Sequence, residues 1–333
     1  MKYNYVIFWR DWVGLYKQSF SDLNGIANAR YISSPLTYMS RPKKLLWKLQ
    51  CHFPHVNHAM GHVLGKLWIT PRFYYPSFFV DDFIEKKELV FVFKYDLLSE
   101  MYINYISFLK QRYPSSRMVL VFTDLCKTCD NFKEIIERIS FDLILSFDQG
   151  DCKEYGFIYH PLVFSKFRGV LENMPQSDLY FMGQPKDRLT EIIACLEKLW
   201  DNGVKTDVQL VNVPLEQQVY KDRINYIDGW IPYQTNLQHF LHTNCALELM
   251  QHGGVGYTQR MCEAIAFDKK IITNNSRIQD APFYNPKFVF KINSAADITP
   301  ELCERVKKVE PVDYHYKEQI SPIELLEFIE KHL

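Results

Sequence analysis

The sequence predicts two similar α/β domains, each built on a largely parallel sheet with helices packed against it. The chain has 333 residues, about twice the length of a typical domain. Short apolar runs alternate with stretches of helical periodicity. This alternation starts afresh after residue 178, behind the connection FSKFRGVLENMPQSD, which contains proline and glycine. The boundary is therefore expected between residues 165 and 178, which gives domains 1–170 and 171–333.

The first domain contains six apolar runs of strand length. VFVF and VLVF are continuous rather than alternating, which is typical of strands buried on both faces of a parallel sheet. Residues between the runs carry apolar side chains at helical spacing. The expected strands are 5–9, 29–33, 89–94, 118–123, 143–147 and 157–159, and the expected helices are 100–111 and 131–139.

The second domain repeats the pattern in the same order. Its first helix is expected over 189–201 and is closed by Gly203, a residue that readily ends a helix. The remaining helices are expected at 236–242, 258–266 and 323–331. The expected strands are 179–182, 208–213, 224–227, 245–250, 270–273 and 289–291.

The formal net charge is zero, but the charges are unevenly distributed along the chain. Residues 1–80 contain ten lysines and arginines against two acids, so this segment carries an excess of eight positive charges and the remainder an equal negative excess. Such a basic lobe suggests a docking surface for phosphate, nucleic acid or anionic lipid. The alternative is a set of scattered, solvated lysines.

Most of these lysines and arginines lie within a helical insertion expected at about 41–72, which includes RPKKLLWKLQCHFPHVNHAMGHVLGKLW. Lysine and tryptophan alternate there with leucine as in interfacial helices, which predicts peripheral membrane contact. Nucleic acid is the alternative, but no nucleic-acid motif accompanies the segment. Its four histidines are interpreted as a polar helix face rather than a metal site, because no third ligand is defined. They are His52, His55, His58 and His62.

The eight cysteines are dispersed, no secretory signal precedes YNYVIFW, and no stretch approaches 18 uninterrupted apolar residues. We therefore expect a reduced, cytoplasmic environment with free thiols. Cys126 and Cys129 form a single CxxC without a second pair, which only weakly supports zinc or redox chemistry.

Glycine is concentrated in one short stretch, QHGGVGYTQRMCEA, between an expected strand and an expected helix. Glycine lets a ligand approach the backbone, and a helix beginning near Thr258 directs free N–H groups and its positive dipole end toward the turn. Arg260 could clamp a diphosphate there, and Glu263 could accept both hydroxyls of a ribose. The alternative is a plain turn with Glu263 in an internal salt bridge.

The wider segment CALELMQHGGVGYTQRMCEAIAFDKKIITNN resembles the donor site of GT-B-fold glycosyltransferases, in particular bacterial enzymes that build lipopolysaccharide, capsule or exopolysaccharide. SFDQGDCKEYGFIYHPLVF and YFMGQPKDRLTEIIACLEKLWDNG are similar to the same group. The resemblance implies two Rossmann-like domains facing each other across a cleft. The second would bind the nucleotide-sugar donor and the first the acceptor.

By this resemblance, Glu263 would hold the donor ribose, and the turn with Thr258 and Arg260 would cradle the diphosphate. The turn contributes Gly253, Gly254 and Gly256. Gly183 would begin a loop facing the cleft, where Lys186 and Arg188 offset phosphate charge or, alternatively, are simply solvated. Tyr233 would stack on the nucleobase or pack in the core.

Transfer at the anomeric carbon requires positioning, stabilisation of the leaving diphosphate and, for inversion, a general base. Glu248 lies fifteen residues before Glu263, so the retaining pattern of two glutamates about eight apart is absent. No metal is expected, because cationic side chains and a helix N-terminus can replace it, and DQGD lacks the DxD context. Candidate bases follow strands of the first domain and could instead cap helices. They are Asp11, ranked first, with Asp96 and Asp124.

The sequence therefore predicts a cytoplasmic, peripherally membrane-associated glycosyltransferase of the inner membrane's cytoplasmic face, with a lipid-linked or growing surface glycan as acceptor and no cofactor. One alternative is a nucleotide-sugar epimerase of the same architecture. The other is a non-catalytic nucleotide- or glycan-binding protein.

Overall fold

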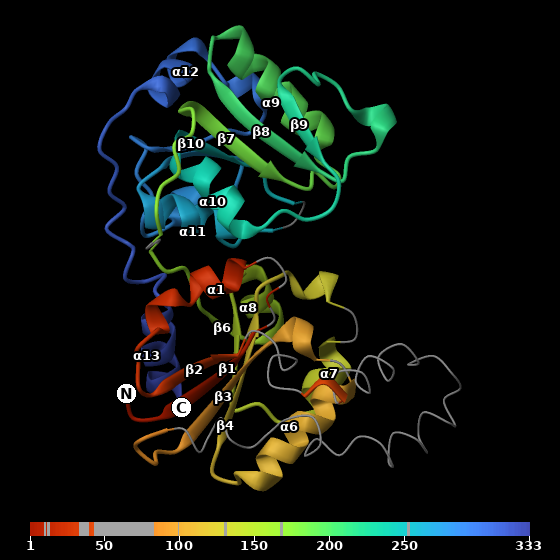
Figure 1. Ribbon diagram of the computed structural model, residues 1–333, viewed down its shortest axis with the longest axis vertical. Coiled ribbons are helices and arrows are strands. Elements are labelled where there is room, and N and C mark those ends of the chain that lie inside the picture. The colour runs from red at the N-terminus through yellow and green to blue at the C-terminus, as the bar shows by residue number, and fades with distance from the viewer. Residues whose placement is uncertain are drawn as a thin grey trace.

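A computed structural model describes residues 1–9, 11, 14–32, 40–42, 83–98, 100–129, 132–166, 169–251 and 254–333. These residues form two six-stranded sheets in which every strand pairing is parallel (Figure 1). The predicted α/β fold class is confirmed. Gly253 and the basic insertion beyond Pro42 lie outside the described residues.

The first sheet has the strand order β2-β1-β3-β4-β5-β6. Alternate side chains point to opposite faces, and both faces are covered. Phe91 and Phe93 pack on one face with residues of α6 and α7, while Val90 and Val92 pack on the other with residues of α13. The elements of this unit are β1 Asn4–Phe8, α1 Leu15–Ser19, β2 Ala29–Ile32, β3 Leu89–Lys94, α6 Glu100–Arg112, β4 Arg117–Phe122, α7 Phe132–Arg138, β5 Leu143–Ser146, α8 Gln149–Tyr155 and β6 Ile158–Tyr159.

The second sheet has the order β12-β11-β10-β7-β8-β9. Tyr180 packs with α10 and α11 on one face, and its neighbours Leu179 and Phe181 pack with α9 and α12 on the other. The elements are β7 Ser177–Gly183, α9 Leu189–Asp201, β8 Thr206–Val211, β9 Ile224–Ile227, α10 Tyr233–Leu241, β10 Thr243–Glu248, α11 Gln259–Phe267, β11 Lys270–Thr273, β12 Val289–Lys291, α12 Pro300–Lys307 and α13 Pro322–His332.

The structure differs from the sequence prediction at several helices. α1, α8 and α12 were not predicted, although α12 has a recognisable start: the Thr299 hydroxyl caps it and Pro300 occupies its first turn. α10 begins at Tyr233, three residues before the expected start, directly after Pro232. This earlier start places Tyr233 on a helix face that packs inward.

The last helix, α13, packs on the first sheet although it follows the second sheet in the chain (Figure 1). The Tyr5 hydroxyl donates to the Leu326 carbonyl at 3.0 Å, and the Lys2 backbone N–H donates to the Glu330 carboxylate at 2.6 Å. The chain therefore crosses between the two units twice.

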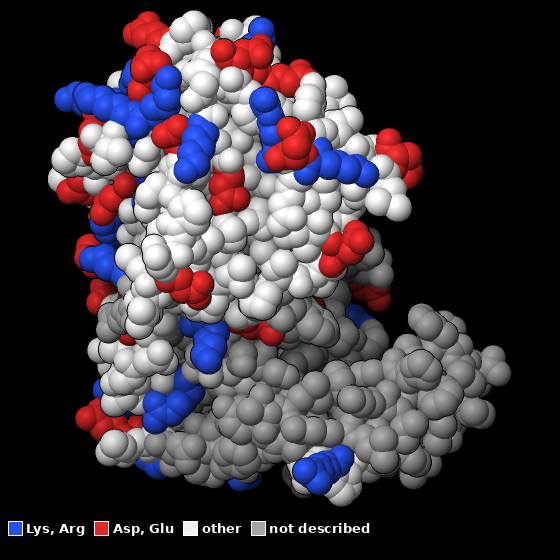
Figure 2. Space-filling model, turned by 45° about the horizontal axis from the view of Figure 1, so that its top comes forward, with Lys and Arg blue, Asp and Glu red and all other residues white. Residues whose placement is uncertain are grey.

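The carboxyl ends of both sheets point toward the junction between the units (Figure 1). Loops that follow parallel strands at this edge are the usual location of ligand sites in α/β folds. The surface of the second unit shown in Figure 2 carries interspersed acidic and basic side chains, so neither sign dominates on that face. Among the described helices, none combines the length and the apolar character needed to cross a bilayer.

Candidate functional site

The N-terminus of α11 lies at the carboxyl end of β10, and its first backbone amides have no partner among the described residues. Thr258 occupies the N-cap position but its hydroxyl donates to Glu248 rather than capping the helix. No described residue accepts from the amides of Gln259, Arg260 or Met261. These amides and the positive end of the helix dipole favour an anionic ligand.

Glu248 lies beneath this helix end and is 2% exposed. Its two carboxylate oxygens accept from the hydroxyls of Thr258 and Thr273, the latter at 2.5 Å. Burial raises the pKa of Glu248, and the two hydroxyls and Arg260 act in the opposite direction. Glu248 thus fixes Thr258 from inside the fold.

Two guanidinium groups occupy the edge between the carboxyl ends of β7 and β10. Arg260 donates to the carbonyls of Met182 and Leu247, the latter at 2.9 Å, and lies 4.7 Å from the Phe181 ring centre. Arg188 donates to the Leu249 carbonyl. Burial and then the charge of Arg260 lower the pKa of Arg188. The two cations repel each other, and an anion bound between them would relieve that repulsion.

The loop after β7 contributes the remaining predicted cation. A Cβ on Gly183 would lie 3.6 Å from a guanidinium nitrogen of Arg260, so these two predicted residues are neighbours. Lys186 is exposed and turns the loop with a positive φ of 54°. The structure therefore brings Gly183, Arg188, Thr258 and Arg260 to one edge of the second sheet.

The Glu263 side chain is buried, with 5% of its surface exposed, and it contacts Tyr233. The Tyr233 hydroxyl donates to Glu263 Oε1 at 2.5 Å, whereas no described group donates to the second oxygen. Burial raises the pKa of Glu263 to about 7, and the Tyr233 hydroxyl and Arg260 act to lower it. Tyr233 itself packs in the core beside Phe164, so its ring has no free face for a nucleobase.

Trp230 is an exposed aromatic residue that the sequence prediction missed. It follows β9 at the same carboxyl edge and is 80% exposed, three residues before the buried Tyr233. Strands lie about 4.8 Å apart in a sheet, so the end of β9 is about 10 Å from the end of β7, two strands away. The preceding Gly229, with φ of 86° and its amide bonded to Asn212, directs the chain outward.

The glycine turn contacts the first unit instead of facing open space. The amides of Val255 and Gly256 donate to Asp148 Oδ2 at 3.0 and 2.8 Å. A Cβ on Gly256 would lie 2.7 Å from the Phe147 carbonyl oxygen, which explains why glycine is required there. In this structure a carboxylate of the protein therefore binds the amides of Val255 and Gly256, at the turn that was predicted to cradle a diphosphate together with Thr258 and Arg260.

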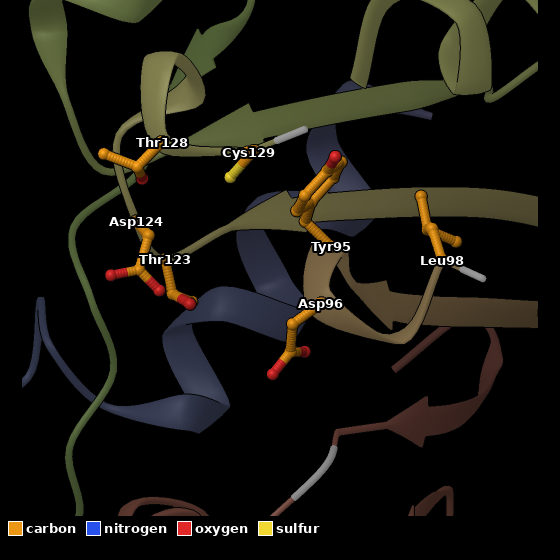
Figure 3. A pocket seen from close by; sticks show the side chains of 7 residues that line it. All are labelled: Tyr95, Asp96, Leu98, Thr123, Asp124, Thr128 and Cys129. Carbon is orange, nitrogen blue, oxygen red and sulfur yellow. The ribbon is translucent and has the colours of Figure 1, made fainter. Parts of the chain in front are cut away.

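The first unit contributes a cavity of about 290 Å³ at the carboxyl ends of β3 and β4. Two of the three candidate bases, Asp96 and Asp124, line it (Figure 3). Asp96 forms an ion pair with Lys94 at 2.8 Å. Asp124 has no hydrogen bond or ion pair with any described residue. The other lining residues are Tyr95, Leu98, Thr123, Thr128 and Cys129.

Asp11, the first-ranked base, supports the start of α1. Its two oxygens accept from the amides of Gly14 and Lys17 at 2.8 and 2.6 Å, and it does not line the cavity. Of the three candidate bases, Asp96 and Asp124 therefore line the cavity and Asp11 does not. Burial raises the pKa of the Cys129 thiol in this cavity to about 11, so it stays protonated at neutral pH.

No protein-family model matches the chain, and no curated protein matches it at a significant level. Solved structures do match. An α-glucosyltransferase in complex with UDP and a 13-mer DNA containing an A:G mismatch has a TM-score of 0.55 and 11% identity over 98% of both chains. A UDP-forming α,α-trehalose-phosphate synthase from Burkholderia xenovorans, in complex with glucose-6-phosphate, has a TM-score of 0.51 and 9% identity over 99% of both chains.

TarM also matches, with a TM-score of 0.46 and 10% identity over 73% of this chain and 54% of its own, so this chain spans about half of TarM. The two closer superpositions extend over both units and the junction between them. The chain has the fold of the GT-B glycosyltransferases.

Proposed function

We propose that the chain is a glycosyltransferase that moves a sugar from a nucleotide-sugar donor to a glycan acceptor, without a metal ion and with inversion at the anomeric carbon. The observation that carries this proposal is the convergence of Arg188, Arg260 and the free α11 amides at one edge of the second sheet. The UDP bound to the similar α-glucosyltransferase supports a nucleoside diphosphate as leaving group.

The donor diphosphate would lie between the two guanidiniums and the N-terminus of α11, with Lys186 at the open side. Charge-assisted hydrogen bonds from these groups stabilise the leaving diphosphate, which is the role a metal ion plays elsewhere. Glu263, oriented through one oxygen by Tyr233, would accept the ribose hydroxyls on the other. Trp230 would stack on the nucleobase at the exposed end of β9.

The acceptor would occupy the cavity of the first unit. Its hydroxyl gives its proton to Asp124 as its oxygen attacks the anomeric carbon. The bond between that carbon and the diphosphate breaks, and its electron pair goes to the leaving diphosphate oxygen. Asp124 suits this role because no described cation or donor competes for its carboxylate.

We further propose a lipid-linked surface glycan as acceptor and a peripheral contact of the basic first unit with the cytoplasmic face of the inner membrane. The excess of eight positive charges in residues 1–80 supports this contact. Sedimentation with vesicles of anionic lipid tests it, and recovery that is equal with neutral vesicles would contradict it.

A thermal-shift screen against nucleotide sugars, followed by assay of nucleotide release, tests the central proposal. Arg188→Met should weaken binding of the stabilising nucleotide roughly tenfold or more, since it removes a charge-assisted interaction. Arg223→Met is the matched control, because Arg223 lies at the amino end of β9 against Trp200. Equal affinity in both variants would reject the donor site.

A further inference from the structure

Asp148 connects the two units through a single buried side chain. It follows β5 and is 2% exposed. Its Oδ1 accepts from the amides of Gly150 and Asp151 at 2.8 and 3.1 Å, which caps α8 within the first unit. Its Oδ2 accepts from the amides of Val255 and Gly256 in the second unit. One carboxylate thus binds four backbone donors, two from each unit.

The packing around this contact is close on both sides. The Phe147 ring and carbonyl occupy the space where a Gly256 side chain would lie, and they would approach a Cβ at this position to between 2.7 and 2.9 Å. Asn275 donates to the Gly256 carbonyl at 3.1 Å from within the second unit. The turn is therefore held between Asn275 and Asp148, so a displacement of either unit breaks charge-assisted hydrogen bonds.

The contact lies between the two halves of the site. On one side, Gly256 is two residues before Thr258, where α11 begins with its free amides and Arg260. On the other side, β5 pairs directly with β4, whose carboxyl end leads to Asp124. Asp148 thus connects the turn before the donor-binding helix end to the strand beside the one that leads to the cavity.

We infer that Asp148 is a positioning residue for glycosyl transfer: it sets the distance between the donor held by the second unit and the acceptor hydroxyl in the first. This inference rests on the proposed function. Misplacement of reacting groups by about 1 Å can lower a rate roughly a hundredfold, so a clamp at this point affects turnover more than affinity. The donor groups all lie in the second unit and retain their contacts without Asp148.

Asp148→Ser separates the two roles of the carboxylate. Serine caps helices well but is too short to reach the turn, so α8 keeps its cap and the contact between units is lost. We expect kcat for transfer to fall at least tenfold while the donor dissociation constant changes less than about twofold. Asp148→Asn places an amide N–H₂ against two N–H donors. It should likewise lower kcat while leaving the donor dissociation constant nearly unchanged.

Hydrogen exchange supplies a readout that does not depend on turnover. The amides of Val255 and Gly256 should be protected in the wild type and exchange faster in Asp148→Ser. Asp297→Ser is the control, because Asp297 accepts from two amides, of Asn293 and Ser294, wholly within the second unit. It should leave both kcat and the protection of the turn unchanged.

The outcomes distinguish this inference from the proposed function. Wild-type kcat in Asp148→Ser, with sugar transfer intact, overturns the positioning role and leaves the enzyme assignment standing. If the amides of Val255 and Gly256 are as protected from exchange in Asp148→Ser as in the wild type, Asp148 does not hold the two units together, whatever the activity. Loss of protection in Asp148→Ser, together with a wild-type protein that turns over no nucleotide sugar, would reject the proposed function and leave the contact between the units standing. If the serine variant does not fold, Gly256→Ala displaces the same contact from the second unit and should give the same kcat loss.

Discussion

Glu263→Gln should change the pH dependence of stability in a direction and amount that the structure sets. Burial raises the pKa of Glu263 from 4.5 to about 7. A group whose pKa is raised in the folded state stabilises the protein fully below its unfolded pKa, and this contribution is lost as the pH rises through the folded value. At 1.36 kcal/mol for each pKa unit, the loss amounts to about 3 kcal/mol by pH 9. The side chain is 5% exposed, so little of this is screened by solvent.

Urea denaturation of both proteins between pH 4.5 and pH 9 measures this effect. Glutamine keeps the acceptor for the Tyr233 hydroxyl but cannot ionise, so its stability relative to the wild type should increase by about 3 kcal/mol across the range. Tyr233→Phe removes a donor that lowers the pKa of Glu263, so its loss of stability should be larger and should extend to higher pH. A difference between glutamine variant and wild type that stays constant with pH would refute the reasoning.

Three further predictions concern the turn, the nucleobase and the base. Gly256→Ala should lower the free energy of unfolding by about 2–4 kcal/mol, because the added methyl group clashes with Phe147 and hydrogen bonds are lost. Gly254→Ala is the control: its Cβ meets nothing closer than 3.5 Å, so the free energy of unfolding should change by less than about 1 kcal/mol. Equal urea midpoints for the two variants would contradict the close contact at Gly256. Trp230→Ala should weaken nucleotide binding roughly tenfold in calorimetry and leave pyrophosphate binding unchanged; a parallel loss for both ligands would exclude stacking. Asp124→Asn should lower kcat roughly a hundredfold or more at unchanged nucleotide affinity, and wild-type turnover would remove it as the base.

The sheets could be predicted because their strands are buried on both faces and therefore continuously apolar. VFVF and VLVF needed no tertiary information to be assigned to a parallel sheet. The position of α13 could not be predicted in the same way. Its apolar stripe, including Leu325, Leu326 and Ile329, shows that one face is buried but not which sheet covers it.

The candidate site was only partly predictable, for a related reason. Arg188 and Arg260 could be identified because each belongs to a loop or helix start directly behind a strand. The partner of the glycine turn could not, since Asp148 is 108 residues away from Gly256 in sequence. Whether Tyr233 stacks on a ligand or packs in the core depended on whether α10 starts before or after residue 233, and helix ends are uncertain by such amounts.

The return of α13 has a consequence for how the chain folds. The first sheet is covered on one face by residues 322–332, which are synthesised only after the entire second unit. Until then, Tyr5, Val90 and Val92 lack the apolar side chains of α13 that cover them. A nascent chain with only the first six strands therefore exposes an apolar, aggregation-prone face of the sheet. The second unit, whose sheet spans residues 177–291, is complete earlier. Folding order should therefore run against chain order, with the unit made first maturing last.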